Sequence, residues 1–334
     1  MTPDRGLGLQ GLLRTWRPEM SSSSPTPHVT SSHSHIRRIF LGNSGLRSGW
    51  RFAIFLIIFL VSVLLSARLL GYFVPQVHVW ATSQLYDSIQ PGFTLFERSW
   101  ELAFLFIATF VMSRIEKRSL FSYGLPWRGA LGRKFWFGSA IGLCGASVLM
   151  LLIATFGGYS FGPLELGLGS TLKYALVWAV VFYVGGGLLE EFLFRGYTLT
   201  TLAEAIGFWP AATVLSFLFA AVHLSSPGER WPGLLAVFCF GLLAALTLRI
   251  TGDLWFVIGL HTAWDWAHVF LFSVPIAGMT GPGRLMHAEL HGPQWLTGGT
   301  VGPDGSIFVF LVLLGIAVLV WRLPFAWLAL KPCP

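Results

Sequence analysis

Several ionisable residues lie inside apolar stretches of the sequence, where charge is unfavourable, and six of them have types and spacings suited to chemistry. They are Glu190, Glu191, Arg195, His223, His261 and Asp265. An ionisable side chain at bilayer depth costs about 3 kcal/mol or more, so each such residue is a candidate for function. Carboxylates and imidazoles are also the groups that most often donate and accept protons in catalysis. These residues therefore indicate acid–base chemistry within apolar segments.

Helical spacing divides these residues into groups. Glu191 and Arg195 are four positions apart, so they share a helix face and can form an ion pair. Glu190 points about 100° away from Glu191 on the same helix. His261 and Asp265 are also four positions apart and project together. We expect carboxylates and two imidazoles from three helices to converge in one polar pocket. A structural clamp is an equally open interpretation of the Glu191–Arg195 pair.

The elements that position these residues are predicted to be transmembrane helices. The chain of 334 residues is 54% hydrophobic and 11% charged, whereas a soluble domain carries about a quarter charged residues. A bilayer span needs about 20 apolar residues. We predict an all-α, polytopic integral membrane protein with about eight transmembrane helices that enclose a polar intramembrane site. The predicted spans are 51–72, 99–113, 135–156, 174–194, 210–225, 232–250, 254–274 and 306–323.

The net charge of +7 does not indicate a nucleic-acid partner, because the basic residues form no single stripe. They gather before the first span and between the second and third, and Arg195 and Arg249 fall on the same predicted side. The opposite loops carry only Arg98, Lys173, Arg230 and Arg284. The positive-inside rule then predicts both termini on the cytoplasmic side, in a membrane that we expect to be the bacterial inner membrane.

Two regions are predicted along the chain. Residues 1–49 are rich in Ser and basic residues and cannot bury enough apolar surface to fold alone, so we predict a disordered cytoplasmic tail. Residues 50–334 form the predicted transmembrane helical domain. Within that domain, the Gly/Pro-rich stretch 278–306 is expected to form a turn-rich outer loop and no helix.

Three short motifs resemble those of a known family. EEFLFR at 190–195 resembles the EExxxR motif of the CPBP family (CAAX proteases and bacteriocin-processing enzymes, also called the ABI family). FAAVH at 219–223 is similar to its FxxxH motif, and HTAWD at 261–265 to its HxxxN or HxxxD motif. The motifs occur in the family's order on separate apolar segments. The resemblance covers about residues 115–325, the predicted protease core.

The resemblance implies an eight-helix intramembrane endopeptidase, a probable metalloprotease, that acts on a membrane-associated peptide or protein near lipid. Glu190 and His223 would activate the attacking water, and Glu191 with Arg195 would hold the helix. His261 and Asp265 would serve the tetrahedral intermediate or a metal. Peptide hydrolysis does need an activated water, a proton donor for the leaving amine and an oxyanion stabiliser.

Asp265 bears on whether a metal takes part. An Asn amide, which the family also carries here, can donate a hydrogen bond to an oxyanion, whereas an ionised Asp cannot. Two His and one carboxylate are a known ligand set for catalytic Zn²⁺, so His223, His261 and Asp265 are candidate metal ligands. A metal-free, glutamate-type mechanism is compatible with the same residues.

Two alternative functions fit part of the sequence. A proton-coupled membrane transporter could use the same Glu and His residues as a relay, but its usual internal repeats are absent from the sequence. A non-catalytic membrane scaffold could keep the fold, although it has no need for Glu190, His223 and His261 together. The residues therefore favour an endopeptidase.

Overall fold

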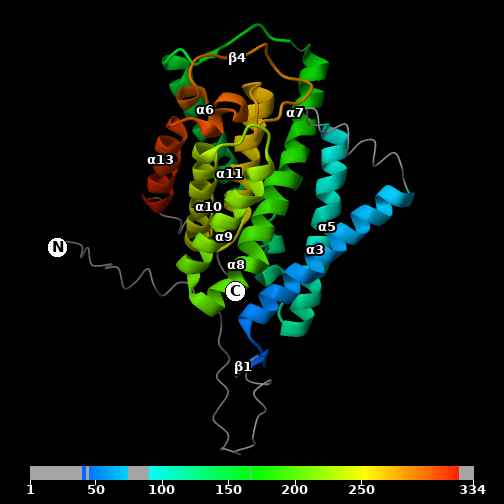
Figure 1. Cartoon of the computed structure of the whole chain (residues 1–334). Helices are drawn as coiled ribbons and strands as arrows, with labels where there is room; N and C mark the ends of the chain where they lie inside the picture. Colours follow the sequence, from blue (N-terminus) through cyan, green and yellow to red (C-terminus); the bar gives the residue numbers. More distant parts are fainter. Residues whose placement is uncertain (1–39, 43–44, 74–89, 166, 323–334) are drawn as a thin grey trace, which may run out of the picture. The chain divides into compact units, whose positions relative to one another are not determined.

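The computed structural model describes residues 40–42, 45–73, 90–165 and 167–322 (Figure 1). The chain divides into two units, Met1–Arg47 and Ser48–Pro334, and each is considered by itself. In the first unit, β1 (Leu41–Gly42) pairs antiparallel with β2 (Gly45–Leu46). This short ladder lies within the tail that is predicted to be disordered, and backbone hydrogen bonds join its two strands. Residues 1–39 of that tail lie outside the described residues.

The second unit is helical, which confirms the all-α prediction, and each of the eight predicted spans coincides with a helix. The main helices are α3 (Ser48–Phe73), α5 (Pro91–Glu116), α6 (Arg133–Thr155), α7 (Leu168–Phe182), α9 (Phe208–Val222), α10 (Trp231–Thr251), α11 (Trp255–Trp266) and α13 (Phe308–Arg322). Within the described ranges, five helical segments are long and apolar enough to cross a membrane. The protein is therefore an integral membrane protein, while the count of eight spans stays a prediction.

One continuous helical run, Leu168–Ile206, carries the EEFLFR motif. It consists of α7, the π-helix η3 (Tyr183–Glu190), the π-helix η4 (Leu193–Tyr197) and α8 (Thr198–Ile206). The predicted span ended at 194, so Glu190 was expected near a helix end. The run continues for twelve more residues and bends at Gly196, whose ψ of −114° is not helical. Glu190 and Glu191 therefore lie within the helical run and not at its end.

Helix α11 packs against α6, α7 and α10 and is almost wholly buried (Figure 1). Glycines allow its backbone to approach α6 closely. A β-carbon added at Gly138 would lie 1.9 Å from the Phe256 carbonyl oxygen, and one at Gly142 would lie 2.1 Å from that of Leu260. Small residues permit such contacts between membrane helices. This packing fixes the helix that carries His261 and Asp265.

The Gly/Pro-rich stretch is mostly turns, as predicted, but it also contains short helices. These are α12 (Gln294–Thr297), η7 (Gly299–Val301) and η8 (Pro303–Gly305). Upstream, β4 (Glu289–Leu290) pairs antiparallel with β3 (Tyr159–Ser160). The remaining short segments are three 3-10 helices, η1 (Leu120–Ser122), η2 (Trp127–Gly129) and η5 (His223–Ser225), and the π-helix η6 (Ala267–Leu271). The loop contacts the helices, since Trp178 Nε1 on α7 donates to the Pro282 carbonyl.

Large apolar side chains cover the outward faces of several helices. Leu64 on α3 is 65% exposed, and Leu311 on α13 is 60% exposed. The interior is instead filled by rings such as Trp178, Phe192 and Phe256. In water such exposed apolar faces would be unfavourable, whereas lipid tails are as apolar as these side chains. The distribution fits a surface that faces lipid.

Candidate active site

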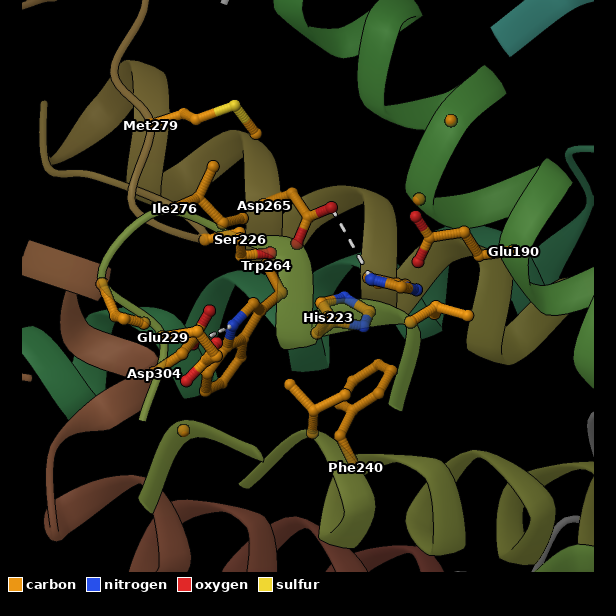
Figure 2. A pocket seen from close by; sticks show the side chains of 18 of the residues that line it. Glu190, His223, Ser226, Glu229, Phe240, Trp264, Asp265, Ile276, Met279 and Asp304 are labelled. Carbon is orange, nitrogen blue, oxygen red and sulfur yellow. Dashed lines mark hydrogen bonds and ion pairs between the residues drawn. The ribbon is translucent and has the colours of Figure 1, made fainter. Parts of the chain in front are cut away.

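A cavity of about 560 Å³ opens among the helices that carry the three motifs (Figure 2). Glu190, His223, His261 and Asp265 all line it. Glu190 ends the π-helix η3, His223 follows the last turn of α9, and the other two lie on α11. Figure 2 shows the side chains of Glu190, His223 and Asp265 directed toward one space. The structure thus brings together four of the six predicted site residues around one cavity.

The Glu190 carboxylate is free at the cavity wall. It makes no hydrogen bond and no ion pair with any residue that the structure describes. The π-helix on which it lies is a rare conformation that occurs often at functional sites. A carboxylate that faces a cavity without a protein partner can accept a proton from a small molecule bound there.

Glu191, one residue along, is fully buried behind the cavity and joins a chain of polar contacts. Arg195 Nη1 lies 3.2 Å from Glu191 Oε2, and His261 Nδ1 lies 2.8 Å from Glu191 Oε1. On the far side of the imidazole, His261 Nε2 lies 3.7 Å from Asp265 Oδ2. Glu191 was predicted to pair with Arg195 and hold its own helix. The structure shows that it also orients His261 on a second helix.

The tautomer of His223 follows from its partner. His223 Nδ1 lies 2.8 Å from the Phe219 carbonyl oxygen, which can only accept, so Nδ1 carries the proton. His261 donates its Nδ1 proton to the Glu191 carboxylate in the same way. In a neutral imidazole the other nitrogen, Nε2, then holds a lone pair. His223 can therefore accept a proton at Nε2 from the cavity side.

Glycine in η3 is needed for α11 to approach the π-helix. A β-carbon at Gly186 would lie 2.5 Å from Asp265 Oδ2 and 3.4 Å from His261 Nε2. One at Gly187 would lie 2.3 Å from Thr262 Oγ1. The sequence GGG before LLEE therefore leaves space for the polar side chains of α11. No side chain larger than hydrogen fits at Gly186 unless Asp265 moves.

Arg195 is buried within the protein, with only 2% of its side chain exposed. Its guanidinium lies 4.4 Å over the Phe219 ring, an aromatic contact that stabilises a desolvated cation. Counting Arg195 among the cytoplasmic loop charges was therefore wrong, because the helical run continues past it. The predicted orientation in the membrane stays a prediction.

The three candidate metal ligands, His223, His261 and Asp265, line the same cavity and are chemically suitable donors. Their positions do not form a ready coordination site. Within the described part of the chain, no three His, Cys, Asp or Glu side chains are grouped closely enough to hold a metal ion. The donor types thus fit Zn²⁺, whereas their arrangement does not.

Four further charged residues line the cavity and were not among the predicted site residues. They are Glu97, Arg98, Glu229 and Asp304. Asp304 Oδ1 accepts a hydrogen bond from Trp264 Nε1 at 3.0 Å, and Figure 2 places both near Glu229. Charges in Gly/Pro-rich loops are common, so no sequence signal identified Glu229 or Asp304. Glu97 and Arg98 were missed because the predicted span began at 99, whereas α5 begins at Pro91.

The fold and the cavity define a polytopic helical membrane protein with a polar intramembrane site. Residues 171–267 match a family model described as type II CAAX prenyl endopeptidase Rce1-like. The matched segment contains all six predicted site residues, and it confirms the CAAX-protease resemblance over this region. Searches of curated proteins and of solved structures returned no match.

Proposed function

We propose that this protein is an intramembrane endopeptidase that hydrolyses a peptide bond of a membrane-associated peptide or protein. One observation carries the proposal: a free carboxylate, Glu190, and two oriented imidazoles, His223 and His261, line one cavity from three separate parts of the chain. The family match over the same segment supports a protease rather than another use of these groups.

In the proposed mechanism, Glu190 accepts a proton from a water molecule bound in the cavity. His223 Nε2 accepts a hydrogen bond from the same water and orients its oxygen toward the scissile carbonyl carbon. The proton taken by Glu190 is then delivered to the leaving amine as the tetrahedral intermediate collapses. One carboxylate thus serves as base and then as acid.

The oxyanion of the intermediate needs a hydrogen-bond donor. His261 Nε2 and Asp265 Oδ2 lie 3.7 Å apart, and a proton carried by either atom and directed at the oxyanion supplies that donor. This arrangement offers what an Asn amide would offer at position 265. Glu191 and Arg195 touch neither the water nor the substrate; they are positioning residues that hold the His261 ring.

Zn²⁺ bound to His223, His261 and Asp265 would supply Lewis-acid activation of the water. The described side chains are not gathered as a coordination site, so no step of the mechanism passes through a metal. Metal dependence is tested directly by dialysis against a chelator followed by Zn²⁺ addition. Loss and recovery of cleavage would establish a metalloprotease.

The test is cleavage of a membrane-peptide library by the purified protein in liposomes. Glu190→Gln and His223→Ala are each expected to lower cleavage by at least about a hundredfold, the usual contribution of acid–base catalysis. Glu289→Gln, which changes an exposed glutamate on β4, is the matched control and should cleave like the wild type. Full cleavage by a folded Glu190→Gln variant would contradict the proposal. Proton uptake without cleavage would favour the transporter alternative.

A further inference from the structure

Arg98 is the only Lys or Arg among the described residues that line the cavity. The same cavity carries five carboxylates: Glu97, Glu190, Glu229, Asp265 and Asp304. Mutual repulsion between carboxylates in a poorly screened cavity disfavours their ionised forms. A single fixed cation is therefore important for whichever carboxylate must stay charged.

Arg98 lies along η3, the π-helix that carries Glu190. Helix α5 packs against η3, and the aliphatic part of Arg98 lies over Gly185. A β-carbon at Gly185 would come within 3.4 Å of Arg98 Cγ. Glu190 follows Gly185 by five residues, about one turn of a π-helix. Arg98 thus crosses η3 on the face from which Glu190 enters the cavity.

Arg98 has an ion-pair partner on its own helix and lines the cavity together with Glu190. Arg98 Nη1 lies 3.0 Å from Glu101 Oε2, an ion pair that holds one edge of the guanidinium. Arg98 and Glu190 make no direct ion pair, but their opposite charges attract one another. The tethered guanidinium is therefore held within electrostatic reach of the Glu190 carboxylate.

The remaining groups around Glu190 offer no equivalent. His261 and Asp265 face it from α11, and His223 from the end of α9. On its own helical run, Arg195 also interacts electrostatically with Glu190, but it is paired with Glu191 and is not among the cavity-lining residues. Glu97 on α5 adds only negative charge. Among the described residues, Arg98 is therefore the Lys or Arg that lines the cavity with Glu190.

We propose that Arg98 is a positioning residue for the proposed hydrolysis. Its guanidinium, held along η3, keeps the Glu190 carboxylate directed into the cavity, where it takes the proton from water. This inference rests on the proposed function and assigns a role to a helix that lies outside the family match at 171–267. Arg98 itself makes no contact with the substrate in this role.

The first test uses Arg98→Met, which keeps the length and removes the charge, and Arg98→Lys, which restores the charge. In liposomes, Arg98→Met is expected to lower kcat about tenfold with KM within about twofold, because the Glu190 carboxylate is no longer held in position toward the bound water. Arg98→Lys should recover most of that loss. Glu289→Gln, at an exposed position on β4, is the control and should not lower kcat.

The second test does not depend on proteolysis. A double-mutant cycle compares the unfolding of the wild type, Arg98→Met, Glu190→Gln and the double variant in one detergent. A coupling of about threefold or more in the unfolding equilibrium constant is expected for a direct charge interaction. Arg98→Met with Glu97→Gln provides the comparison cycle and should show weaker coupling.

The outcomes separate the two proposals. If the wild type cleaves no peptide but the cycle shows coupling, the proposed function fails, whereas the interaction between Arg98 and Glu190 stands. If cleavage is lost on Glu190→Gln but unchanged in Arg98→Met, the assignment of Arg98 is wrong. It is equally wrong if Arg98→Met raises KM alone, since that result places Arg98 in contact with the substrate. Absence of coupling also overturns it.

Discussion

At the scale of single residues, the adjacent carboxylates Glu190 and Glu191 have different surroundings because a helix turns about 100° per residue. Glu190 faces the cavity and makes no hydrogen bond or ion pair with a described residue. Glu191 is fully buried and lies between Arg195 and His261. The same chemical group is thus available for proton transfer at one position and fixed in a charge network at the next.

We therefore predict that the same substitution affects stability differently at these two positions. Glu191→Gln is expected to lower the free energy of unfolding by about 3 kcal/mol, because it leaves the buried Arg195 without a counter-charge. Glu190→Gln should change stability little. Unfolding in detergent, followed by intrinsic fluorescence, measures both.

The double variant Glu191→Gln/Arg195→Met provides the check on that cause. Since it removes both charges, it should be more stable than Glu191→Gln alone. If the double variant loses as much stability as the single variants Glu191→Gln and Arg195→Met lose together, the ion pair is not the source of the loss.

Glu229, in the loop between α9 and α10, gives a pH-dependent prediction. Burial raises the pKa of its carboxyl above the ordinary 4.5, opposed by the Arg230 backbone N–H and by His223. A group whose pKa is higher in the folded state favours folding when protonated, so its contribution is complete below pH 4.5 and is lost as pH rises through the folded-state pKa.

Glu229→Gln should therefore be more stable than the wild type at pH 7, and the difference should shrink as pH falls toward 4.5. Melting temperatures of both proteins between pH 4 and pH 8 measure this. A difference that is constant over the range would show that the Glu229 carboxyl is not responsible.

At the scale of elements, the position of α11 depends on its glycine contacts with α6. The Leu260 carbonyl, next to His261 in the chain, lies where a Gly142 β-carbon would be placed. An added methyl group must move one helix away from the other. Because α11 carries two site residues, a packing change at α6 reaches the cavity.

Gly142→Ala is accordingly expected to lower the free energy of unfolding by about 2 kcal/mol through overpacking and to reduce cleavage. Gly315→Ala on α13 is the matched control, since nothing lies within 4 Å of its β-carbon position. That control should be neutral or slightly stabilising, because Ala favours helix over Gly. Equal stability of the two variants would argue against a tight α6–α11 contact.

At the scale of the whole membrane domain, an ion network at the end of α5 joins distant helices. Glu116 Oε2 lies 2.7 Å from Arg51 Nη1 on α3, and Glu116 Oε1 accepts from the Tyr197 hydroxyl. Glu204 on α8 pairs with the same Arg51 and, at 2.6 Å, with Arg118. The network therefore ties α3, α5 and α8 beside the bend at Gly196.

Glu116→Gln should lower the free energy of unfolding by about 3 kcal/mol, because the carboxylate is only 4% exposed and Arg51 loses a buried partner. In the double variant Glu116→Gln/Tyr197→Phe, the loss of stability should be smaller than the sum of the losses in the two single variants, because the two side chains share one hydrogen bond. Arg128→Gln, at an exposed position, is the control. Additive losses would contradict the proposed link between Glu116 and Tyr197.

Much of the fold and of the candidate site could be predicted from the sequence because both depend on local patterns. Apolar stretches of bilayer length located the eight helices, and charges inside such stretches located Glu190, Glu191, Arg195, His223, His261 and Asp265. Helical spacing also separated Glu190 from Glu191. Helix ends were less predictable, since η3 and η4 continue the fourth helix beyond its apolar part.

The sequence by itself determined that the chain is a helical membrane protein with acid–base residues inside the membrane, because burying charge among apolar residues leaves a clear pattern. Only the tertiary structure showed that Glu191 orients His261 and that Arg98 and Asp304 line the same cavity. These contacts join residues distant in sequence, and packing rather than spacing brings them together. The glycine contacts of α11 decide that packing.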